Sequence, residues 1–352
     1  MLRFVITGLE LYLRDMKLAK PGASPIKNIV IIVKENHTFD NYFGAFGGDA
    51  NGDKVAAAPN PPPYDPDHTH QAWMARANDD RYKVQYGKTD IPGYFDLAQR
   101  FTLCDQYFSE VAGPSTPNHL MLICADAPII NNPHNMYRPT PADVYTLPSL
   151  PIALEKKGLT WGNYGGYAFH YVAALANHQA NHTRDLFLHD AQKGTLPTVS
   201  WVYGDGRPDL SEHPPQNVTD GMQWTLEQVQ ALAAGGLWDS VAIFITWDDW
   251  GGWFDHVVPP VKESWASTKA QRPTDAFPEF NGQPFRFGSR VPCLVVSPYA
   301  KAGHISHQEN SHVSILKFCE TVLGLDALTE RDAASNGMSD CFDFSQSPLQ
   351  KP

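Results

Sequence analysis

Residues Ile26–Gly44 read IKNIVIIVKENHTFDNYFG, an apolar run that leads directly into a polar cluster. The five residues from Ile29 to Val33 are all β-branched, which is typical of a strand buried on both faces, as in a parallel sheet. Glu35 and Asn36 follow this run. Because ligands of open α/β sheets bind beyond the carboxyl ends of the strands, these two oxygen-bearing side chains are candidates for a binding pocket. The alternative is a strand end whose polar residues only meet solvent.

A second stretch repeats this arrangement. Residues 239–247 are mainly apolar and are predicted to form a strand, and Asp248 and Asp249 come directly after them. Two adjacent carboxylates at such a point repel each other at neutral pH unless a cation or a buried proton intervenes. A metal ion held by oxygen ligands is the simplest explanation of this pair.

The segment Gly113–His119 reads GPSTPNH and precedes an apolar run that is predicted to form a buried helix. A hydroxyl at the start of that helix, such as that of Ser115, would meet free backbone N–H groups and the positive end of the helix dipole. Both stabilise an alkoxide and the phosphate oxygens beside it. The alternative is that Ser115 only caps the helix and takes no part in chemistry.

Further apolar runs and helix signals alternate along the chain, and this rhythm is typical of βαβ units. It predicts an α/β fold with a mostly parallel central sheet and helices on both faces. Five further helices are expected: one after Thr38, one within residues 92–109, one over 150–157, one from a cap at Thr219 or Asp220 to Ala234, and one that begins at Ser311. The other expected strands lie within residues 159–166, 198–203 and 287–296.

Composition limits the classes of partner. The 352 residues carry a formal charge of −11, and no run of Lys or Arg interrupts it, so we expect no nucleic-acid partner. The five cysteines are widely spaced without a CxxC pattern, which predicts neither a zinc knuckle nor a disulfide framework. We expect a single domain over residues 1–352, with an N-terminal extension over 1–25 and a polar tail over 327–352.

The N-terminal twenty residues contain an apolar patch, but Glu10, Arg14 and Asp15 interrupt it before it reaches the length of a signal-peptide core. The chain also has no run of about 18 apolar residues that could cross a membrane. These observations favour an unprocessed, cytoplasmic protein without a stable membrane anchor. They leave its oligomeric state open.

Taken in order, five groups of motifs resemble the phosphoesterase family, which contains bacterial acid phosphatases and non-specific phospholipases C. The resemblance covers about residues 26–325 and implies an alkaline-phosphatase-like fold. The motifs are ENHTFDNYFG (35–44), GPSTPNH (113–119), EHPP (212–215), WDDWGGWFDHV (247–257), and SRVPCLVVSP (289–298) with SHVS (311–314).

The resemblance implies a metal-dependent phosphoric ester hydrolase that acts through a phosphoserine. Ser115 would be the nucleophile, because the family places its Ser or Thr two residues before Pro-Asn; Thr116 is the fallback. His213, from EHPP, and His68 would contact phosphoryl oxygens or protonate the leaving group, and His170 is a further candidate. One divalent ion, for which Ca, Mg and Mn are all plausible, would be bound by Glu35, Asn36, Asp248, Asp249 and Ser115.

Several positions depart from the family's pattern. His119 stands where Arg is common, and Asp249 stands where phospholipase-type members often have Glu. The Asp-Asp pair favours the acid-phosphatase branch, with monoesters hydrolysed best and some phosphodiesterase activity. The alternatives are a phospholipase C acting on glycerophospholipids, a catalytically silent relative that binds metal and phosphate, and a sulfatase-like relative. Members of the family are often periplasmic or secreted.

Overall fold

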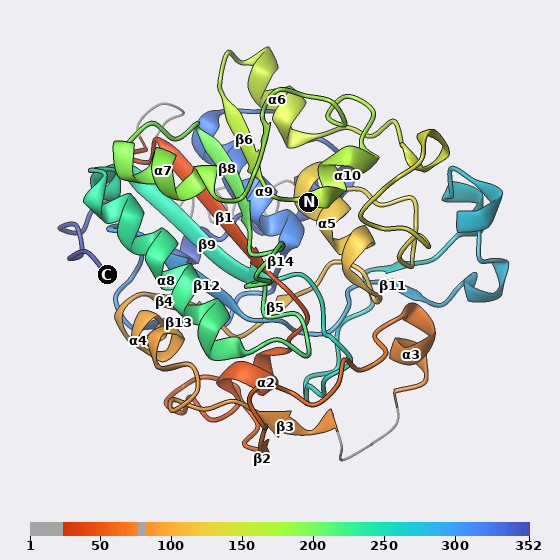
Figure 1. Ribbon diagram of the computed structural model, residues 1–352, viewed down its shortest axis with the longest axis horizontal. Coiled ribbons are helices and arrows are strands. Elements are labelled where there is room, and N and C mark those ends of the chain that lie inside the picture. The colour runs from red at the N-terminus through yellow and green to blue at the C-terminus, as the bar shows by residue number, and fades with distance from the viewer. Residues whose placement is uncertain (1–23, 77–81) are drawn as a thin grey trace, which may run out of the picture.

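A computed structural model describes residues 24–76 and 82–352 and has an eight-stranded sheet at its centre (Figure 1). The strand order is β13-β4-β12-β9-β1-β8-β6-β7. In chain order these strands are β1 (Asn28–Lys34), β4 (Thr102–Cys104), β6 (Trp161–Tyr164), β7 (Asn181–His182), β8 (Val199–Tyr203), β9 (Val241–Trp247), β12 (Cys293–Val296) and β13 (His304–Ser306).

The direction of the strands confirms the predicted mostly parallel sheet. Only β12 runs antiparallel to its neighbours in this sheet, which are β4 and β9. The first strand, β1, lies between β8 and β9, and Ile31 is in register with Trp201 and Phe244. All three side chains are fully buried. A continuous β-branched run suits this central place because both of its faces are covered.

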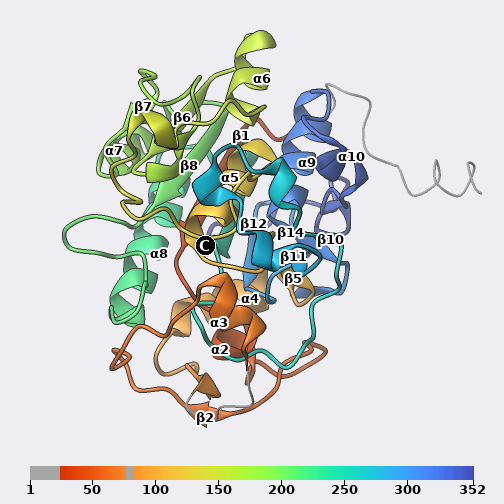
Figure 2. The ribbon, with the colours of Figure 1, turned by 90° about the vertical axis from the view of Figure 1, so that its right-hand side faces the viewer.

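Helices cover both faces of the sheet. Figure 2 shows α7 and α8 on one side and α9 and α10 on the other, with the strands between them. The helices of the described chain are α2 (Phe39–Phe43), α3 (His70–Met74), α4 (Pro92–Arg100), α5 (Ser115–Cys124), α6 (Leu150–Lys156), α7 (Leu186–Lys193), α8 (Val218–Ala234), α9 (His312–Leu323) and α10 (Glu330–Ala334).

Three small two-stranded sheets lie outside the central one. They pair β2 (Ala56–Ala57) with β3 (Val84–Gln85), β5 (Tyr107–Phe108) with β14 (Asn310–Ser311), and β10 (Glu263–Ser264) with β11 (Pro284–Arg286). The strand expected over residues 287–296 is therefore shorter than predicted, because only its last four residues form β12. Its first half instead bonds to the chain around β5, where the Val291 N–H donates to the Tyr107 carbonyl.

The N-terminal cap of α2 is the predicted residue, whereas that of α8 is not. Thr38 caps α2 as predicted and accepts a hydrogen bond from the Asn41 N–H. The cap of α8 is Asn217, whose side chain accepts from the N–H groups of Thr219 and Asp220. The prediction of Thr219 or Asp220 as the cap was therefore wrong by two to three residues, because an equally good capping residue precedes them.

The segment expected as a polar C-terminal tail is partly buried. Most of the expected extension over 1–25, including the apolar patch, lies outside the described residues. The expected tail over 327–352 also contributes Met338, Cys341 and Phe342 to the core. None of the helices within 24–76 and 82–352 combines the length and the apolar character that a membrane crossing needs.

Candidate active site

The register of β1 and β9 brings two carboxylates together at one edge of the sheet. Lys34 at the end of β1 is paired with Trp247 at the end of β9, so the following residues, Glu35 and Asp248, leave the sheet side by side. The Asn36 N–H donates to Asp248 Oδ1 over 2.9 Å and joins the two chain segments. The polar clusters that follow these two strands therefore form one site.

The backbone at Asn36 has an unusual conformation. Its φ of 66° lies in the left-handed region, which non-glycine residues occupy at an energetic disadvantage. Gly251 is needed beside it, because a Cβ at this position would lie 2.0 Å from the Asn36 carbonyl oxygen. The Gly251 N–H also donates to Asp249 Oδ1 over 2.7 Å. Close backbone contact thus holds both polar clusters in place.

Ser115 is the first residue of α5 and makes no capping hydrogen bond, so the interpretation of Ser115 as a helix cap was wrong. Its hydroxyl points instead at the two polar clusters. Three acceptor oxygens surround Ser115 Oγ: Glu35 Oε2 at 3.3 Å, Asn36 Oδ1 at 3.5 Å and Asp249 Oδ2 at 3.2 Å. The structure therefore brings the predicted nucleophile and the predicted metal ligands together.

The donors and acceptors around Ser115 do not balance. A hydroxyl has one proton and can donate to only one of its three neighbouring acceptors. In addition, Glu35 Oε1 and Asp248 Oδ2 are buried and accept no aligned hydrogen bond among the residues that the structure describes, although the ring of His119 lies within ion-pair distance of both. Buried carboxylate oxygens that accept no hydrogen bond are disfavoured. A divalent cation with hard oxygen ligands would satisfy this set, so the residues present fit a metal site.

Sequence reasoning noted His119 only as a departure from the family and missed its place in the site. It lies four residues after Ser115 on α5 and is fully buried. Its Nε2 is 3.3 Å from Glu35 Oε1 and 3.2 Å from Asp248 Oδ2. The spacing of four residues, which places two side chains on the same face of a helix, was the signal that could have found it.

The charges of the site shift each other's pKa values. Burial and repulsion by Asp248 raise the pKa of Glu35 well above its usual value, and the same two causes raise that of Asp249. Against the effect of burial, contact with His119 lowers the pKa of Asp248. Burial also disfavours a charged His119, but Glu35 and Asp248 together hold its pKa well above the usual value. The protein alone therefore does not accommodate three ionised carboxylates easily.

Two of the three predicted histidines lie next to this cluster. His68 Nε2 is 3.1 Å from Asn36 Nδ2, and the His68 and His213 rings are 5.9 Å apart. Each ring has its Nδ1 within hydrogen-bond distance of a backbone carbonyl, that of Pro66 or Pro214. This fixes Nδ1 as the donor and directs Nε2 towards other partners.

His170 does not join them. It lies in a 3₁₀ helix over Tyr167–Tyr171, and its Nδ1 bonds to the Ala176 carbonyl over 2.7 Å. Within the described chain this is its one hydrogen bond, and no contact links it to Ser115. The predicted role of His170 therefore gains no support from a contact, because the turn directs the ring to its own segment.

A buried ion pair supports the loop that carries His213. Glu212 has a φ of 74° and is fully buried, and Lys34 Nζ lies 3.2 Å from its Oε1. The hydroxyls of Tyr42 and Tyr94 both donate to the Glu212 carboxylate over 2.6 Å. Charge-assisted hydrogen bonds of this kind keep the residue before His213 in its left-handed conformation.

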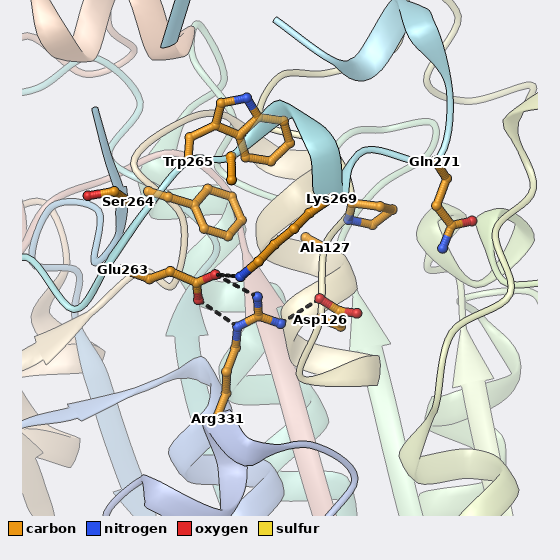
Figure 3. Close-up of a pocket in the computed structure, with 11 residues that line it drawn as sticks. Asp126, Ala127, Glu263, Ser264, Trp265, Lys269, Gln271 and Arg331 are labelled. Carbon is orange, nitrogen blue, oxygen red and sulfur yellow. Dashed lines mark hydrogen bonds and ion pairs between the residues drawn. The ribbon is translucent and has the colours of Figure 1, made fainter. Parts of the chain in front are cut away.

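A cavity of about 360 Å³ lies at the opposite end of α5 from Ser115. Figure 3 shows its charged side chains pointing toward one another. Arg331 bonds to Glu263 and Asp126, and Lys269 Nζ lies 2.6 Å from Glu263 Oε1. Because these charges neutralise each other and none of the predicted site residues lines the cavity, it is separate from the site around Ser115.

The sequence matches a known protein family and several phospholipases C. The phosphoesterase family model matches residues 64–326. Phospholipase C B of Mycobacterium tuberculosis is 29% identical over 95% of this chain and 83% of its own length. The non-hemolytic phospholipase C of Pseudomonas aeruginosa is 27% identical over 93% of this chain but only 58% of its own length.

Among solved structures, human ectonucleotide pyrophosphatase/phosphodiesterase 5 matches with a TM-score of 0.52 and 9% identity, covering 90% of this chain and all of that chain. This likeness concerns the fold and agrees with the alkaline-phosphatase-like architecture predicted from the sequence. The family match spans most of the chain and includes Ser115, His213, Asp248 and Asp249. The chain therefore belongs to the phosphoesterase family and is a phosphoric ester hydrolase.

Proposed function

We propose that this enzyme hydrolyses a phosphodiester, with Ser115 as its nucleophile and a divalent cation bound by Glu35, Asn36, Asp248, Asp249 and Ser115. The observation that carries the proposal is the set of three acceptor oxygens within 3.5 Å of Ser115 Oγ. When bound, the cation would supply positive charge to the phosphoryl oxygens and lower the pKa of the hydroxyl.

The protein's own groups support a covalent mechanism. Ser115 lies at the N-terminus of the ten-residue helix α5, where the helix dipole favours negative charge. Its hydroxyl proton would pass to the Asp249 carboxylate, whose Oδ2 lies 3.2 Å from Oγ, as Oγ attacks phosphorus and the P–O bond to the leaving alcohol breaks. The phosphoryl group, with any remaining substituent, would then be bonded to Ser115 until water releases it. For a monoester this intermediate is a phosphoserine, and for a diester it is a phosphoserine ester.

The leaving alcohol needs a proton, and His213 is the best placed donor. Its Nδ1 bonds to the Pro214 carbonyl over 2.7 Å, while its Nε2 has no hydrogen-bond partner in the described parts of the chain. His68 Nε2, by contrast, already lies within hydrogen-bond distance of the Asn36 side chain. We therefore assign proton donation to His213 in its imidazolium form, in which Nε2 carries the proton that passes to the leaving oxygen while Nδ1–H stays bonded to the Pro214 carbonyl. His68 would contact a phosphoryl oxygen, also as an imidazolium, because only then does its Nε2 carry a proton.

Charge favours a diester over a monoester. The carboxylates of Glu35 and Asp249 contact Ser115, Asp248 lies behind them against His119, and among the described side chains in contact with these three carboxylates only His119 is basic. A phosphodiester carries one negative charge at neutral pH, whereas a monoester carries up to two, so the diester meets less repulsion here. The names of the relatives agree, since a phospholipase C cleaves a phosphodiester bond.

A lipid substrate is supported by an exposed aromatic residue beside the site. Tyr137 is 58% exposed and contacts Tyr167. The Tyr167 hydroxyl in turn lies 3.0 Å from Thr116 Oγ1, next to the nucleophile. Exposed apolar side chains beside a polar site suit a substrate with a charged head and an apolar remainder.

A substrate panel tests the proposal. Purified enzyme is assayed with bis-p-nitrophenyl phosphate, phosphatidylcholine vesicles and p-nitrophenyl phosphate over a range of pH. We expect both diesters to be hydrolysed with a higher kcat/KM than the monoester. A monoester preference at every pH would contradict this and would support the acid-phosphatase activity that the Asp248–Asp249 pair favours by resemblance. Acid-quenched enzyme should carry the covalent ester on the peptide that contains Ser115.

A further inference from the structure

The two carboxylate oxygens of Glu35 face different partners. Oε2 lies 3.3 Å from Ser115 Oγ, whereas Oε1 lies 3.3 Å from His119 Nε2. On that second side, Asp248 Oδ2 is 3.2 Å from the same nitrogen. Glu35 Oε1, His119 Nε2 and Asp248 Oδ2 thus form a triangle in which all three atoms lie within 4.8 Å of one another. It lies next to the oxygen cluster around Ser115, which consists of Glu35 Oε2, Asn36 Oδ1 and Asp249 Oδ2.

Within the described chain these three atoms have only one another as partners, through the two ion-pair distances from His119 Nε2. The residues are at most 2% exposed, and each of the three atoms lacks a hydrogen-bond partner in the described chain. The His119 nitrogen is therefore near two carboxylate oxygens without forming an aligned hydrogen bond to either. Buried polar atoms of this kind normally have partners, so three that converge on one point indicate an additional ligand.

The spacing of the triangle matches the coordination of a small cation. Zinc binds His nitrogen and carboxylate oxygen at about 2.0–2.2 Å, and tetrahedral geometry then separates neighbouring ligand atoms by about 3.3–3.5 Å. The measured separations from His119 Nε2 are 3.3 and 3.2 Å. One nitrogen and two carboxylate oxygens are a ligand set typical of zinc, whereas the all-oxygen set around Ser115 suits harder ions.

We propose that Glu35, His119 and Asp248 bind a second divalent cation, of the zinc class, and that Glu35 bridges it to the ion beside Ser115. This second site rests on the proposed function in one respect, because it shares Glu35 and Asp248 with the ion proposed beside Ser115. It goes beyond the single ion that the sequence predicts. Three protein ligands leave one position of a tetrahedral ion open to water.

The surroundings of His119 hold its ring ready for this role. The Tyr167 and Tyr203 rings lie 5.1 and 5.4 Å from it, centroid to centroid. A ring confined in this way loses little freedom on binding an ion. The competing role is that of a protonated counter-ion to Glu35 and Asp248, and the two roles predict different behaviour when His119 is replaced by Arg.

The substitution His119→Arg separates them. Arg keeps the positive charge but has no lone pair with which to bind a metal. Full-length wild type and His119→Arg are stripped with a chelator, reloaded with Zn²⁺ and Mg²⁺, dialysed, and analysed for metal. We expect two divalent ions per wild-type chain, one of them zinc, and loss of one zinc equivalent in His119→Arg. Equal metal content in the two proteins would overturn the second site.

The variant Asp249→Asn distinguishes a failure of the second cation site from a failure of the proposed function. Asp249 belongs to the oxygen cluster and is not part of the His119 triangle, so its substitution should weaken the ion beside Ser115 and leave the zinc equivalent bound. A single ion that is lost in Asp249→Asn and retained in His119→Arg would overturn the second site while leaving the proposed function in place. Absence of any bound ion in active wild type would overturn both.

A measurement on the wild type alone guards against a misfolded variant. Co²⁺ in a tetrahedral site with a nitrogen ligand absorbs visible light far more strongly than Co²⁺ in an octahedral oxygen site. We expect the intense tetrahedral bands when stripped enzyme is loaded with Co²⁺, and their removal by one equivalent of Zn²⁺. Only the weak octahedral bands would contradict the proposal.

Discussion

Ser115 Oγ lies 3.2 Å from Asp249 Oδ2, although 134 positions separate the two residues in the chain. One belongs to the first turn of α5 and the other to the loop after β9. Their closeness joins the predicted nucleophile to the predicted metal ligands in one buried site. Both side chains are at most 1% exposed, so their interaction is weakly screened by water.

Replacing the nucleophile should abolish turnover without removing the metal. In Ser115→Ala we expect kcat to fall by about three orders of magnitude or more, because no other hydroxyl can take the place of Oγ. Metal content should change little, since the carboxylates remain. The matched control is Thr116→Ala, whose Oγ1 contacts Tyr167 instead of the oxygen cluster, and which should lose far less activity. Full activity in Ser115→Ala would rule out the covalent mechanism.

Removal of the metal should destabilise the folded enzyme. Without a cation, Glu35, Asp248 and Asp249 repel one another in a buried site. An ion that binds only the folded state adds about 3 kcal/mol to the free energy of unfolding at a concentration about 100-fold above its Kd. We expect a chelator to lower the melting temperature and to abolish activity, and the added divalent ion to restore both. An unchanged melting temperature would argue against a tightly bound ion.

The buried pair of Lys34 and Glu212 should be sensitive to loss of one partner. Both side chains are fully buried, and removing one charge from such a pair typically lowers the free energy of unfolding by about 3–5 kcal/mol. We expect a loss of this size in Lys34→Met. The control is Lys262→Met, since Lys262 and its partner Glu309 are 38% and 41% exposed; it should lose less than about 1 kcal/mol.

Denaturant unfolding of the two lysine variants measures the difference. Because Glu212 directly precedes His213 in the chain, Lys34→Met should have a second effect. The ion pair holds the loop that carries His213, so kcat should fall along with stability. A variant as stable as Lys262→Met would show that the hydrogen bonds from Tyr42 and Tyr94 hold Glu212 without Lys34.

Stability should depend on pH through Glu320. This side chain is 2% exposed, and burial together with nearby Asp332 raises its pKa from the usual value of 4.5 to about 9. A carboxyl whose pKa is higher in the folded state contributes stability below its unfolded pKa, and that contribution is lost as pH rises through the folded value. Wild type should therefore lose stability relative to Glu320→Gln between pH 4.5 and about 9.

Paired unfolding curves at several pH values test this prediction. The free energy of unfolding of Glu320→Gln minus that of wild type should be smallest below pH 4.5, should increase towards neutral pH, and should level off above about 9. The difference reports Glu320 together with Asp332, because the hydrogen bond from Glu320 lowers the pKa of Asp332 and is changed in the variant. A difference that does not change with pH would show that Lys317, 3.7 Å away, keeps the carboxylate ionised.

Local sequence patterns were sufficient for the architecture. The β-branched run that became β1 and the apolar run that became β9 predicted buried parallel strands, because burial on both faces requires apolar side chains on both. The expected strand over residues 287–296 was too long, since its first half bonds to the chain around Tyr107. Apolar character alone cannot say which neighbour a segment pairs with.

The candidate site was predictable only in part. Glu35, Asn36, Asp248 and Asp249 could be selected because they follow buried strands, and Ser115 because the resemblance places the nucleophile two residues before Pro-Asn. His119 was missed as a member of the site, since a histidine inside an apolar helix resembles a core residue and only its spacing of four residues from Ser115 marks it. His170 was selected although its ring bonds within its own segment.

The sequence by itself determined which residues could form strands, where those strands end, and which polar side chains stand at their ends. Only the tertiary structure decided that β1 and β9 are neighbours in register, so that Glu35 and Asp248 emerge together. It also decided that α5 directs Ser115 and His119 at the two sides of Glu35. The physical reason is that strand formation depends on local side chains, whereas a shared site depends on which distant segments pack together.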